Sequence, residues 1–217
     1  LLVAATSGDV DVLTLLLERG ASLDVRAPDG ASPLHIAARF GHVAALTVLA
    51  SATAHATRAA LPPGTGNKDR EAAVSASLAT PAGPRARSAL HDAVAIGSID
   101  CVAALIAAGA KADVVDSFGQ SPLHLVANVD RSRSVQLAQL LLGAGANARL
   151  PDARGFSALH AAAVSDNAEL VRILVSSRTV GLDDRSARGE TALDVATRYG
   201  QDRAADVLVR AGSTFTN

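Results

Sequence analysis

Histidine is the residue type in this chain with the clearest capacity for metal chemistry, because neutral imidazole nitrogens are common zinc ligands. Four of the six histidines each follow a leucine in similar short blocks that recur along the chain: His35, His91, His124 and His160. Such a row of imidazoles could suggest a metal array. Whether the rings can share an ion depends on the distance between the elements that carry them.

A second candidate is the segment of residues 64–68, which superficially resembles part of a phosphate-binding loop because it reads Gly-Thr-Gly-Asn-Lys. It lacks the full spacing of such a loop, and no strand is predicted before it. No nucleophile motif and no paired carboxylates stand out elsewhere. The sequence therefore predicts no catalytic residue, no cofactor and no metal, and we expect the chain not to be an enzyme.

The histidine blocks belong to an internal repeat. Five blocks begin in the same way: Ser32-Pro33-Leu34-His35, Ser88-Ala89-Leu90-His91, Ser121-Pro122-Leu123-His124, Ser157-Ala158-Leu159-His160 and Thr191-Ala192-Leu193-Asp194. Their leucines are 56, 33, 36 and 34 residues apart. Leu1 lies 33 residues before Leu34, so it marks a sixth, truncated copy.

Each copy carries the signals of two helices. Ser32 and Ser121 are good N-caps, and the prolines that follow them suit the first helical turn, where a missing N–H costs nothing. A second apolar stretch in each copy has helical spacing, as in Leu170-Val171-Leu174-Val175. The elements that position the histidines are therefore paired helices.

A period of about 33 residues with a Thr-Pro-Leu-His-like opening resembles the ankyrin repeat. The resemblance implies an all-α solenoid of helix-turn-helix units, each with a short β-hairpin or loop, stacked into a curved array. It also implies that the histidine rings hydrogen-bond the backbone and help to join neighbouring repeats. Helices packed about 8–10 Å apart hold such rings too far apart to share one zinc ion with bonds of about 2 Å.

We expect one repeat domain over residues 1–217. Its six repeats are predicted to span approximately 1–26, 27–53, 85–115, 116–151, 152–184 and 185–217. Residues 54–84 form an insertion rich in Ala, Ser, Thr, Pro and Gly, which predicts a mobile loop that acts as a passive spacer. The alternatives are a functional arm and one short helix over residues 69–79.

The composition favours small helices and excludes several functions. Hydrophobic residues make up 49% of the chain but aromatic residues only 2%, so the interior must consist of Ala, Leu, Val and Ile. The net charge of −1 gives no overall attraction to nucleic acid or to an anionic membrane. No apolar run is long enough to span a bilayer.

Two further features concern the location and the ends of the protein. The single Cys101 excludes an internal disulfide and fits a reducing compartment, so we expect an intracellular and most simply cytoplasmic protein. The chain has no methionine and begins inside a repeat, so we expect a longer protein or a missing start. The last copy carries the small pair Ala204-Ala205 among polar residues, which is typical of a terminal cap.

The resemblance also indicates which positions are exposed and variable: those beside the hairpin glycine and the two after the paired small residues of the first helix. Four of the five aromatic residues and six arginines lie at these positions, against two acids, a local charge of +4. Aromatic residues and arginine dominate binding hot spots. The candidate partner-binding residues are Arg39, Phe40, Ile96, Phe118, Gln120, Arg154, Phe156, Arg188, Arg198 and Tyr199.

Two observations weigh against this assignment. Aromatic residues at these positions also support neighbouring turns in the family. Arginine is moreover the default basic residue of the chain, which has 18 Arg and 2 Lys. The same residues could therefore be structural.

The leading functional hypothesis is a scaffold or adaptor that binds another protein on its concave face, through an acidic and apolar segment of the partner. The first alternative is a recognition domain of a larger enzyme. The second is a permanent subunit of a large assembly, in which the insertion docks. A weaker one is binding of phosphate, in RNA or lipid head groups, by the arginines, which the near-neutral charge disfavours. We expect no small-molecule substrate and no membrane span.

Overall fold

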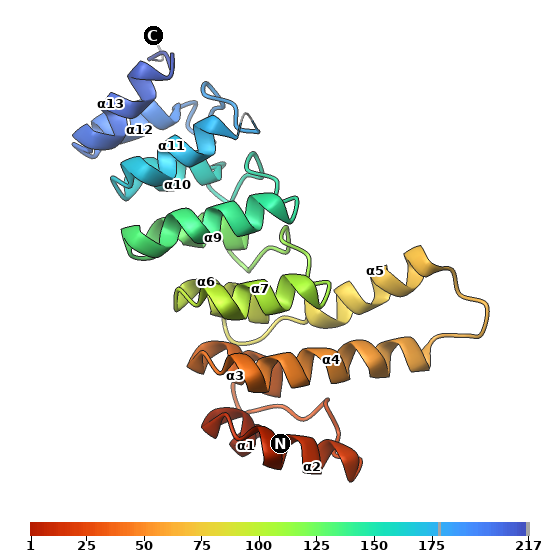
Figure 1. Cartoon of the computed structure of the whole chain (residues 1–217). Coiled ribbons are helices and arrows are strands. Elements are labelled where there is room, and N and C mark those ends of the chain that lie inside the picture. Colours follow the sequence, from red (N-terminus) through yellow and green to blue (C-terminus); the bar gives the residue numbers. More distant parts are fainter. Residues whose placement is uncertain (178, 216–217) are drawn as a thin grey trace. The chain divides into compact units, whose positions relative to one another are not determined.

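The computed structural model describes residues 1–177 and 179–215. Within these ranges the chain is helical and no strand is formed, although one isolated antiparallel bridge joins Ala82 to Arg87. The chain divides into two compact units, Leu1–Ser117 and Phe118–Asn217. Figure 1 shows the helices of both units. The prediction of an all-α repeat fold is confirmed.

The first unit contains three helix pairs and one additional helix. In each pair a short first helix turns directly into a second helix, and like helices of successive pairs pack against each other. The helices are α1 (Leu2–Ser7), α2 (Val10–Glu18), α3 (Pro33–Phe40), α4 (Val43–Ala60), α5 (Asn67–Leu78), α6 (Ala89–Ala95) and α7 (Ile99–Ala107).

The second unit repeats the same arrangement. The first helix of its first pair is short, because after one turn it continues as a 3₁₀ helix. The elements are α8 (Pro122–Leu125), η1 (Val126–Asn128), α9 (Arg131–Gly143), α10 (Ala158–Val164), α11 (Ala168–Ser176), α12 (Ala192–Arg198) and α13 (Asp202–Arg210). Within this unit α10 packs on α12, and α11 packs on both α9 and α13.

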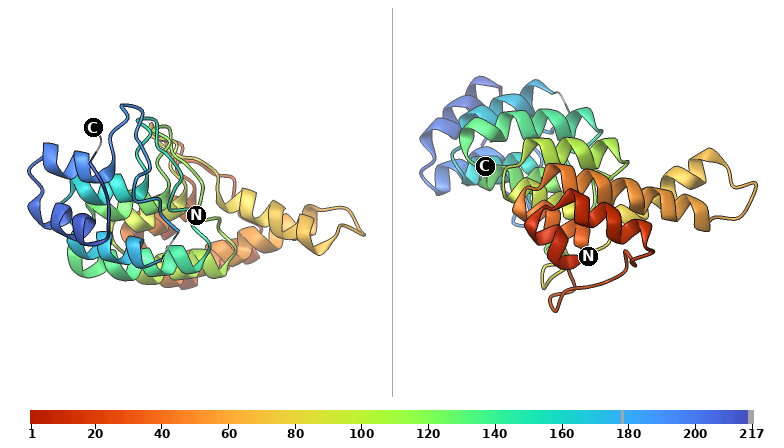
Figure 2. Two further views of the ribbon diagram at one scale, coloured as in Figure 1. Left: turned by 90° about the horizontal axis from the view of Figure 1, so that it is seen from above. Right: turned by 60° about the horizontal axis from the view of Figure 1, so that its bottom comes forward.

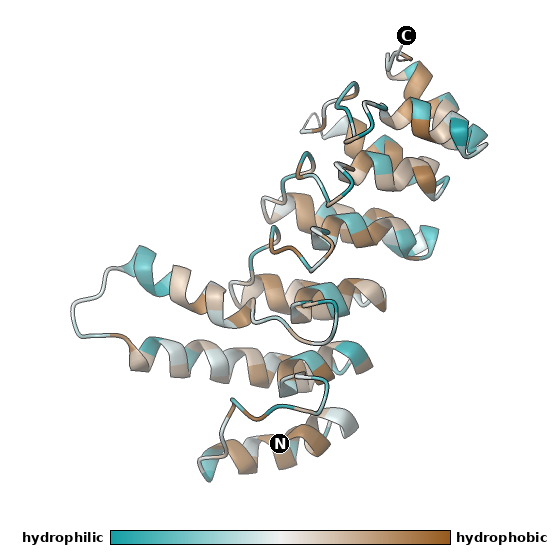
Figure 3. Cartoon of the chain, turned by 180° about the vertical axis from the view of Figure 1, so that it is seen from behind, coloured by the Kyte–Doolittle hydropathy of each residue, from teal (hydrophilic) through white to brown (hydrophobic). Residues whose placement is uncertain are grey.

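The core of each unit consists of leucine, alanine and valine. Leu46 and Leu105 in the first unit, and Leu137 and Leu174 in the second, are fully buried. Buried alanines such as Ala162 lie between them and let neighbouring helices approach closely. This confirms the aliphatic interior that the composition predicts. In Figure 3 the loops between helix pairs are mostly hydrophilic, whereas the helices carry the apolar residues.

The structure differs from the loop expected over residues 54–84. Helix α4 continues to Ala60, and α5 returns antiparallel beside it; both extend beyond the neighbouring helices of the first unit (Figures 1 and 2). We call residues 54–78 the helical arm. The sequence region reads as low in complexity, but alanine has the highest helix propensity of all residues. Small side chains also let the two helices pack closely.

The helical arm is held together by buried apolar residues and by one hydroxyl pair. Ala54, Val74 and Leu78 are buried between the arm helices and their neighbours. Oγ1 of Thr57 lies 3.0 Å from Oγ of Ser77, and this contact links α4 to α5. The short helix offered as an alternative over residues 69–79 therefore corresponds to α5.

Candidate partner-binding surfaces

The repeated blocks build the scaffold on which the candidate residues stand. Nδ1 of His35 lies 2.7 Å from the Ser32 hydroxyl, and its Nε2 lies 3.0 Å from the carbonyl oxygen of Arg87 in the next loop. In the second unit His124 and His160 reach the carbonyl oxygens of Phe156 and Glu190 in the same way, at 2.8 and 3.1 Å. The predicted joining of neighbouring repeats by histidine is confirmed for these three rings.

These contacts also define the charge state of the rings. A carbonyl oxygen only accepts hydrogen bonds, so Nε2 carries the proton and Nδ1 accepts from serine. Burial lowers the pKa of His35 to about 4 and also lowers the pKa of His160. The His35 and His160 rings are therefore neutral at pH 7. Across the described ranges, no group of three histidine, cysteine or acidic side chains is placed to hold a metal.

Backbone hydrogen bonds fix the spacing of the loops that carry the candidate residues. In the first unit the N–H of Gly83 donates to the carbonyl of Asp29 at 3.0 Å. In the second unit the N–H of Ala153 donates to Phe118 at 2.9 Å, and that of Ala187 donates to Arg154 at 3.0 Å. Each loop is thus tied to the next one through main-chain atoms.

In the first unit Arg39 is committed to contacts within the protein. Its Nε donates to the Asp92 carboxylate at 2.9 Å, and its Nη1 donates to Asp29 at 2.5 Å. Asp92 is buried, and burial raises its pKa although Arg39 acts in the opposite direction. Arg39 therefore braces α3 against α6 and the preceding loop. Its role as a contact for a partner's carboxylate stays a prediction, and two of its nitrogen donors are already paired within the chain.

The apolar candidates of the first unit are exposed. The exposed fraction of Phe40 is 59% and that of Ile96 is 39%. Cδ1 of Ile96 would lie 3.4 Å from a Cβ built on Gly41, so Ile96 sits beside the corner that follows Phe40. Phe40 and Ile96 are thus exposed apolar side chains on neighbouring repeats.

In the second unit five of the ten candidates converge on one cavity of about 290 Å³. Its wall consists of Arg154, Phe156, Ala187, Arg188, Arg198 and Tyr199. We call it the Arg188 cavity. Phe118 and Gln120 belong to the same unit but do not line it; Phe118 is 52% exposed and Gln120 is half-buried.

The aromatic residues of the Arg188 cavity differ in accessibility. Tyr199 is 53% exposed, whereas Phe156 is only 5% exposed. The Phe156 ring stacks on His160 with a centroid distance of 5.2 Å, and Cζ of Arg154 lies 4.4 Å from its centre. The expectation that Phe156 offers an exposed contact is therefore corrected. Its ring is covered by the histidine that joins two repeats.

The cationic character of the cavity is weaker than the sequence predicts. Arg154 pairs with Asp152 at 3.1 Å, and Arg198 pairs with Glu190 at 2.6 Å. The guanidinium of Arg188 makes no ion pair with any described residue and is exposed. The sequence count of charges included Glu190 but missed Asp92 and Asp152. Asp152 lies two positions before its partner Arg154, whereas Asp92 is 53 residues from its partner Arg39.

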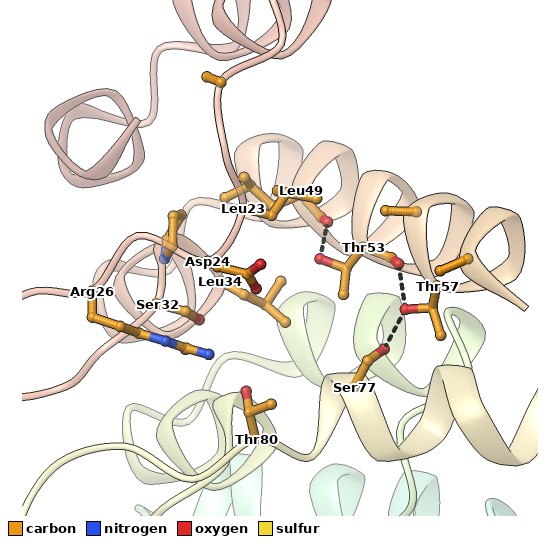
Figure 4. Close-up of a pocket in the computed structure, with 14 residues that line it drawn as sticks. Leu23, Asp24, Arg26, Ser32, Leu34, Leu49, Thr53, Thr57, Ser77 and Thr80 are labelled. Carbon is orange, nitrogen blue, oxygen red and sulfur yellow. Dashed lines mark hydrogen bonds between the residues drawn. The ribbon is translucent and has the colours of Figure 1, made fainter.

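A further cavity, which the sequence does not predict, lies beside the helical arm in the first unit. It measures about 490 Å³ and is bounded by the loop after α2, by the start of α3 and by the arm. In Figure 4 Thr53 and Thr57 of α4 line it, and a hydrogen bond joins Thr57 directly to Ser77 of α5. Both threonine hydroxyls donate to helix carbonyls at 2.8 Å. With Asp24 and Arg26 both in its lining, this cavity has no net charge.

The described residues form a helical repeat protein. Loops between its helix pairs are joined to each other by backbone hydrogen bonds. The family of ankyrin repeats in three copies matches residues 90–184 and 130–217, and ankyrin repeats in many copies match residues 1–50. The chain belongs to the ankyrin repeat family. Ankyrin repeats are general protein–protein interaction modules and are typically not catalytic.

Two solved structures show the same fold. An ankyrin repeat domain from Acinetobacter baumannii AYE is 20% identical, with a TM-score of 0.75, covering 98% of this chain and 97% of that one. The ankyrin repeat domain of Bcl-3, a member of the IkappaB protein family, is 22% identical, with a TM-score of 0.76, covering 100% and 88%. No curated protein matches the chain. Among the described residues, no helix is long and apolar enough to cross a membrane.

Proposed function

We propose that this chain is a scaffold or adaptor that holds another protein and carries out no chemistry of its own. The single observation that carries the proposal is the Arg188 cavity. In it, exposed Tyr199 at the end of α12 lies with Arg188, which makes no ion pair within the described residues and stands on a loop joined to its neighbour. The six predicted repeats then act as one interaction domain. An intracellular, most simply cytoplasmic, site of action fits the free, buried Cys101.

The proposed partner presents an acidic and apolar segment to the side of each unit that carries the loops and first helices. Arg188 supplies a planar donor fork that matches a carboxylate. Tyr199 in the second unit, and Phe40 and Ile96 in the first, offer apolar area for burial. A cavity of about 290 Å³ is at the small end of the range for small-molecule sites, so it suits one side chain of a partner better than a cofactor.

Recognition of phosphate by the loop arginines is less well supported. Arg39, Arg154 and Arg198 already pair with carboxylates of the same chain. A phosphate would have to compete with those acids, whereas one carboxylate needs only Arg188. Attachment to a larger enzyme and membership of a permanent assembly remain compatible with the same contacts.

The experiment that tests the proposal compares matched alanine variants. A partner captured by the wild-type protein is titrated against Arg188→Ala, Tyr199→Ala and the control Arg172→Ala, whose arginine lies on α11 and pairs with Glu169. We expect the first two to weaken binding about tenfold or more, a typical hot-spot effect, and thermal unfolding to stay the same. Unchanged affinity for both variants, with intact folding, would reject the proposal.

A further inference from the structure

We propose that the helical arm carries a phosphate-binding site, distinct from the surfaces that hold a partner protein. The site is a cavity of about 430 Å³ between the arm and the turn after α7. Arg58 comes from the outer half of α4, Lys68 from the start of α5, and Lys111 from the turn. The inference does not depend on the proposed partner.

Three segments that are distant in sequence bring these cations to one place. The turn after α7 approaches the arm closely: a Cβ built on Gly109 would lie 3.8 Å from Cγ1 of Val74. Val74 itself is 2% exposed, so this contact belongs to the core of the arm. The position of Lys111 relative to α5 is therefore set by packing.

The charge of the cavity matches a phosphate group. Its three cations and the carboxylate of Glu71 give a net charge of +2. Arg58, Lys68 and Lys111 make no ion pair within the described ranges, and all three are exposed. A phosphate monoester carries about −1.5 to −2 at pH 7, so it neutralises the site. A single carboxylate leaves half of the charge uncompensated.

The wall also contains an unused hydrogen-bond donor. Ser75 lines the cavity and is only 4% exposed, and no described residue is a partner for its hydroxyl. Buried hydroxyl groups are normally paired. Rotation about the Cα–Cβ bond lets this hydroxyl donate to an anion in the cavity, because serine has three staggered rotamers.

The residue types are also unusual for this chain. Both of its lysines, Lys68 and Lys111, line this one cavity, whereas 17 of its 18 arginines are elsewhere. An ammonium group is a compact charge with three rotatable donors, which suits a phosphate held among several cations. Lys68 ends the 64–68 segment that fails as a phosphate loop. That exclusion stands, because a helix and not a strand precedes the segment and the site uses side chains.

The pair of lysines gives a direct test. Protein labelled with ¹³C on lysine contains two lysine signals, so each signal reports on this cavity. Inorganic phosphate and pyrophosphate are titrated at constant ionic strength against chloride. We expect both signals to shift, to saturate and to give the same dissociation constant. Shifts that stay linear, or that chloride reproduces, would overturn the proposal.

Further titrations distinguish the source of the phosphate. A short phosphoserine peptide is compared with its glutamate counterpart and with free phosphate. Tighter binding of the phosphopeptide than of free phosphate indicates a modified protein as the natural ligand, and the reverse indicates a free phosphate compound; both support the site. Equal binding of the glutamate peptide would overturn the assignment to phosphate.

Variants that keep both lysine reporters complete the test. Arg58→Gln and Ser75→Ala are expected to weaken phosphate binding at least fivefold, and Arg19→Gln, an exposed cation at the end of α2, leaves it unchanged. Thermal unfolding verifies that each variant is folded. An equal effect of Arg19→Gln would reveal general charge attraction and reject the site.

Discussion

The backbone N–H of Ala187 donates a 3.0 Å hydrogen bond to the carbonyl oxygen of Arg154, so two loops that are 33 residues apart touch through main-chain atoms. Between them stands Gly155, with a φ of +75°, and a Cβ at this position would collide with the backbone nitrogen of Ala187. This contact holds the loop of Arg154 beside the loop of Arg188, and both arginines line the Arg188 cavity.

Gly155 is therefore predicted to stabilise the fold in two ways: it accepts a left-handed backbone, and it leaves room for the next loop. Gly189 serves as a control for the first effect alone. Gly189 has a similar φ of +78° but no atom within 4 Å of a built Cβ. Gly189→Ala should cost about 1–2 kcal/mol because of the left-handed backbone alone. Gly155→Ala should cost at least about 1 kcal/mol more, since the loops must also separate. Urea unfolding measures both; equal losses would show that the loops are not in close contact.

Arg39 and Arg188 are both candidate partner-binding residues in the sequence, but their substitution is predicted to change the free energy of unfolding by different amounts. Arg39→Gln should lower the free energy of unfolding by about 1–2 kcal/mol, because buried Asp92 loses its charged partner. Arg188→Gln should change it by less than about 0.5 kcal/mol, as exposed substitutions usually do. Chemical unfolding of both variants tests this, and a stability loss for Arg188→Gln as large as that for Arg39→Gln would contradict it.

Because the buried ring of His35 has a lowered pKa, we expect the stability of the fold to depend on pH. The pKa of His35 is about 4 in the folded chain, below its ordinary 6.5, because burial disfavours the charged ring. The unfolded chain therefore binds more protons between pH 4 and 6.5. Stability contributed by the neutral ring is complete above about pH 6.5 and is lost as the pH falls toward 4.

Urea unfolding from pH 4 to 7.5 tests this contribution by comparison between variants. His35→Gln should show a shallower fall in stability below pH 6.5 than the wild type. The exposed His55→Gln, on the arm half of α4, should retain the wild-type fall. If the His35→Gln and wild-type curves have the same slope, the ring does not titrate as described.

How much of this structure the sequence predicts depends on the range of the interactions. Ser32 and His35 are three residues apart, so the capping contact can be read from a short motif. The partners of Arg39 lie 10 and 53 residues away, and no local pattern reveals that Asp92 is buried beside it. The family pattern therefore indicates exposed positions on first helices and loops, but it does not reveal the acids that pair with their arginines.

The leading prediction of a mobile loop over residues 54–84 fails for a different reason. Their composition has few large apolar residues, and this normally indicates a segment that cannot form a core. Here Val74 and Leu78 are buried against helices that already exist, so α5 needs little apolar area of its own. The length of α4 is likewise set by this packing.

Docking of the arm leads to a prediction about Leu78, which is 1% exposed. Leu78→Ala should destabilise the chain by about 2–4 kcal/mol, as expected for a cavity in a packed core. The matched control is Leu15→Ala on α2, whose leucine is 50% exposed and should cost far less. Thermal unfolding compares the two. A mobile arm would make Leu78→Ala the milder change.

Site-specific photo-crosslinking shows whether a partner protein binds at the Arg188 cavity. A benzoylphenylalanine is introduced into the intact protein at Tyr199, beside the Arg188 cavity, or at Val209 on α13; both positions are 53% exposed. We predict that position 199 captures a discrete partner protein, that Arg188→Ala abolishes this capture, and that position 209 captures none. Capture at position 209 with none at position 199 would contradict this prediction.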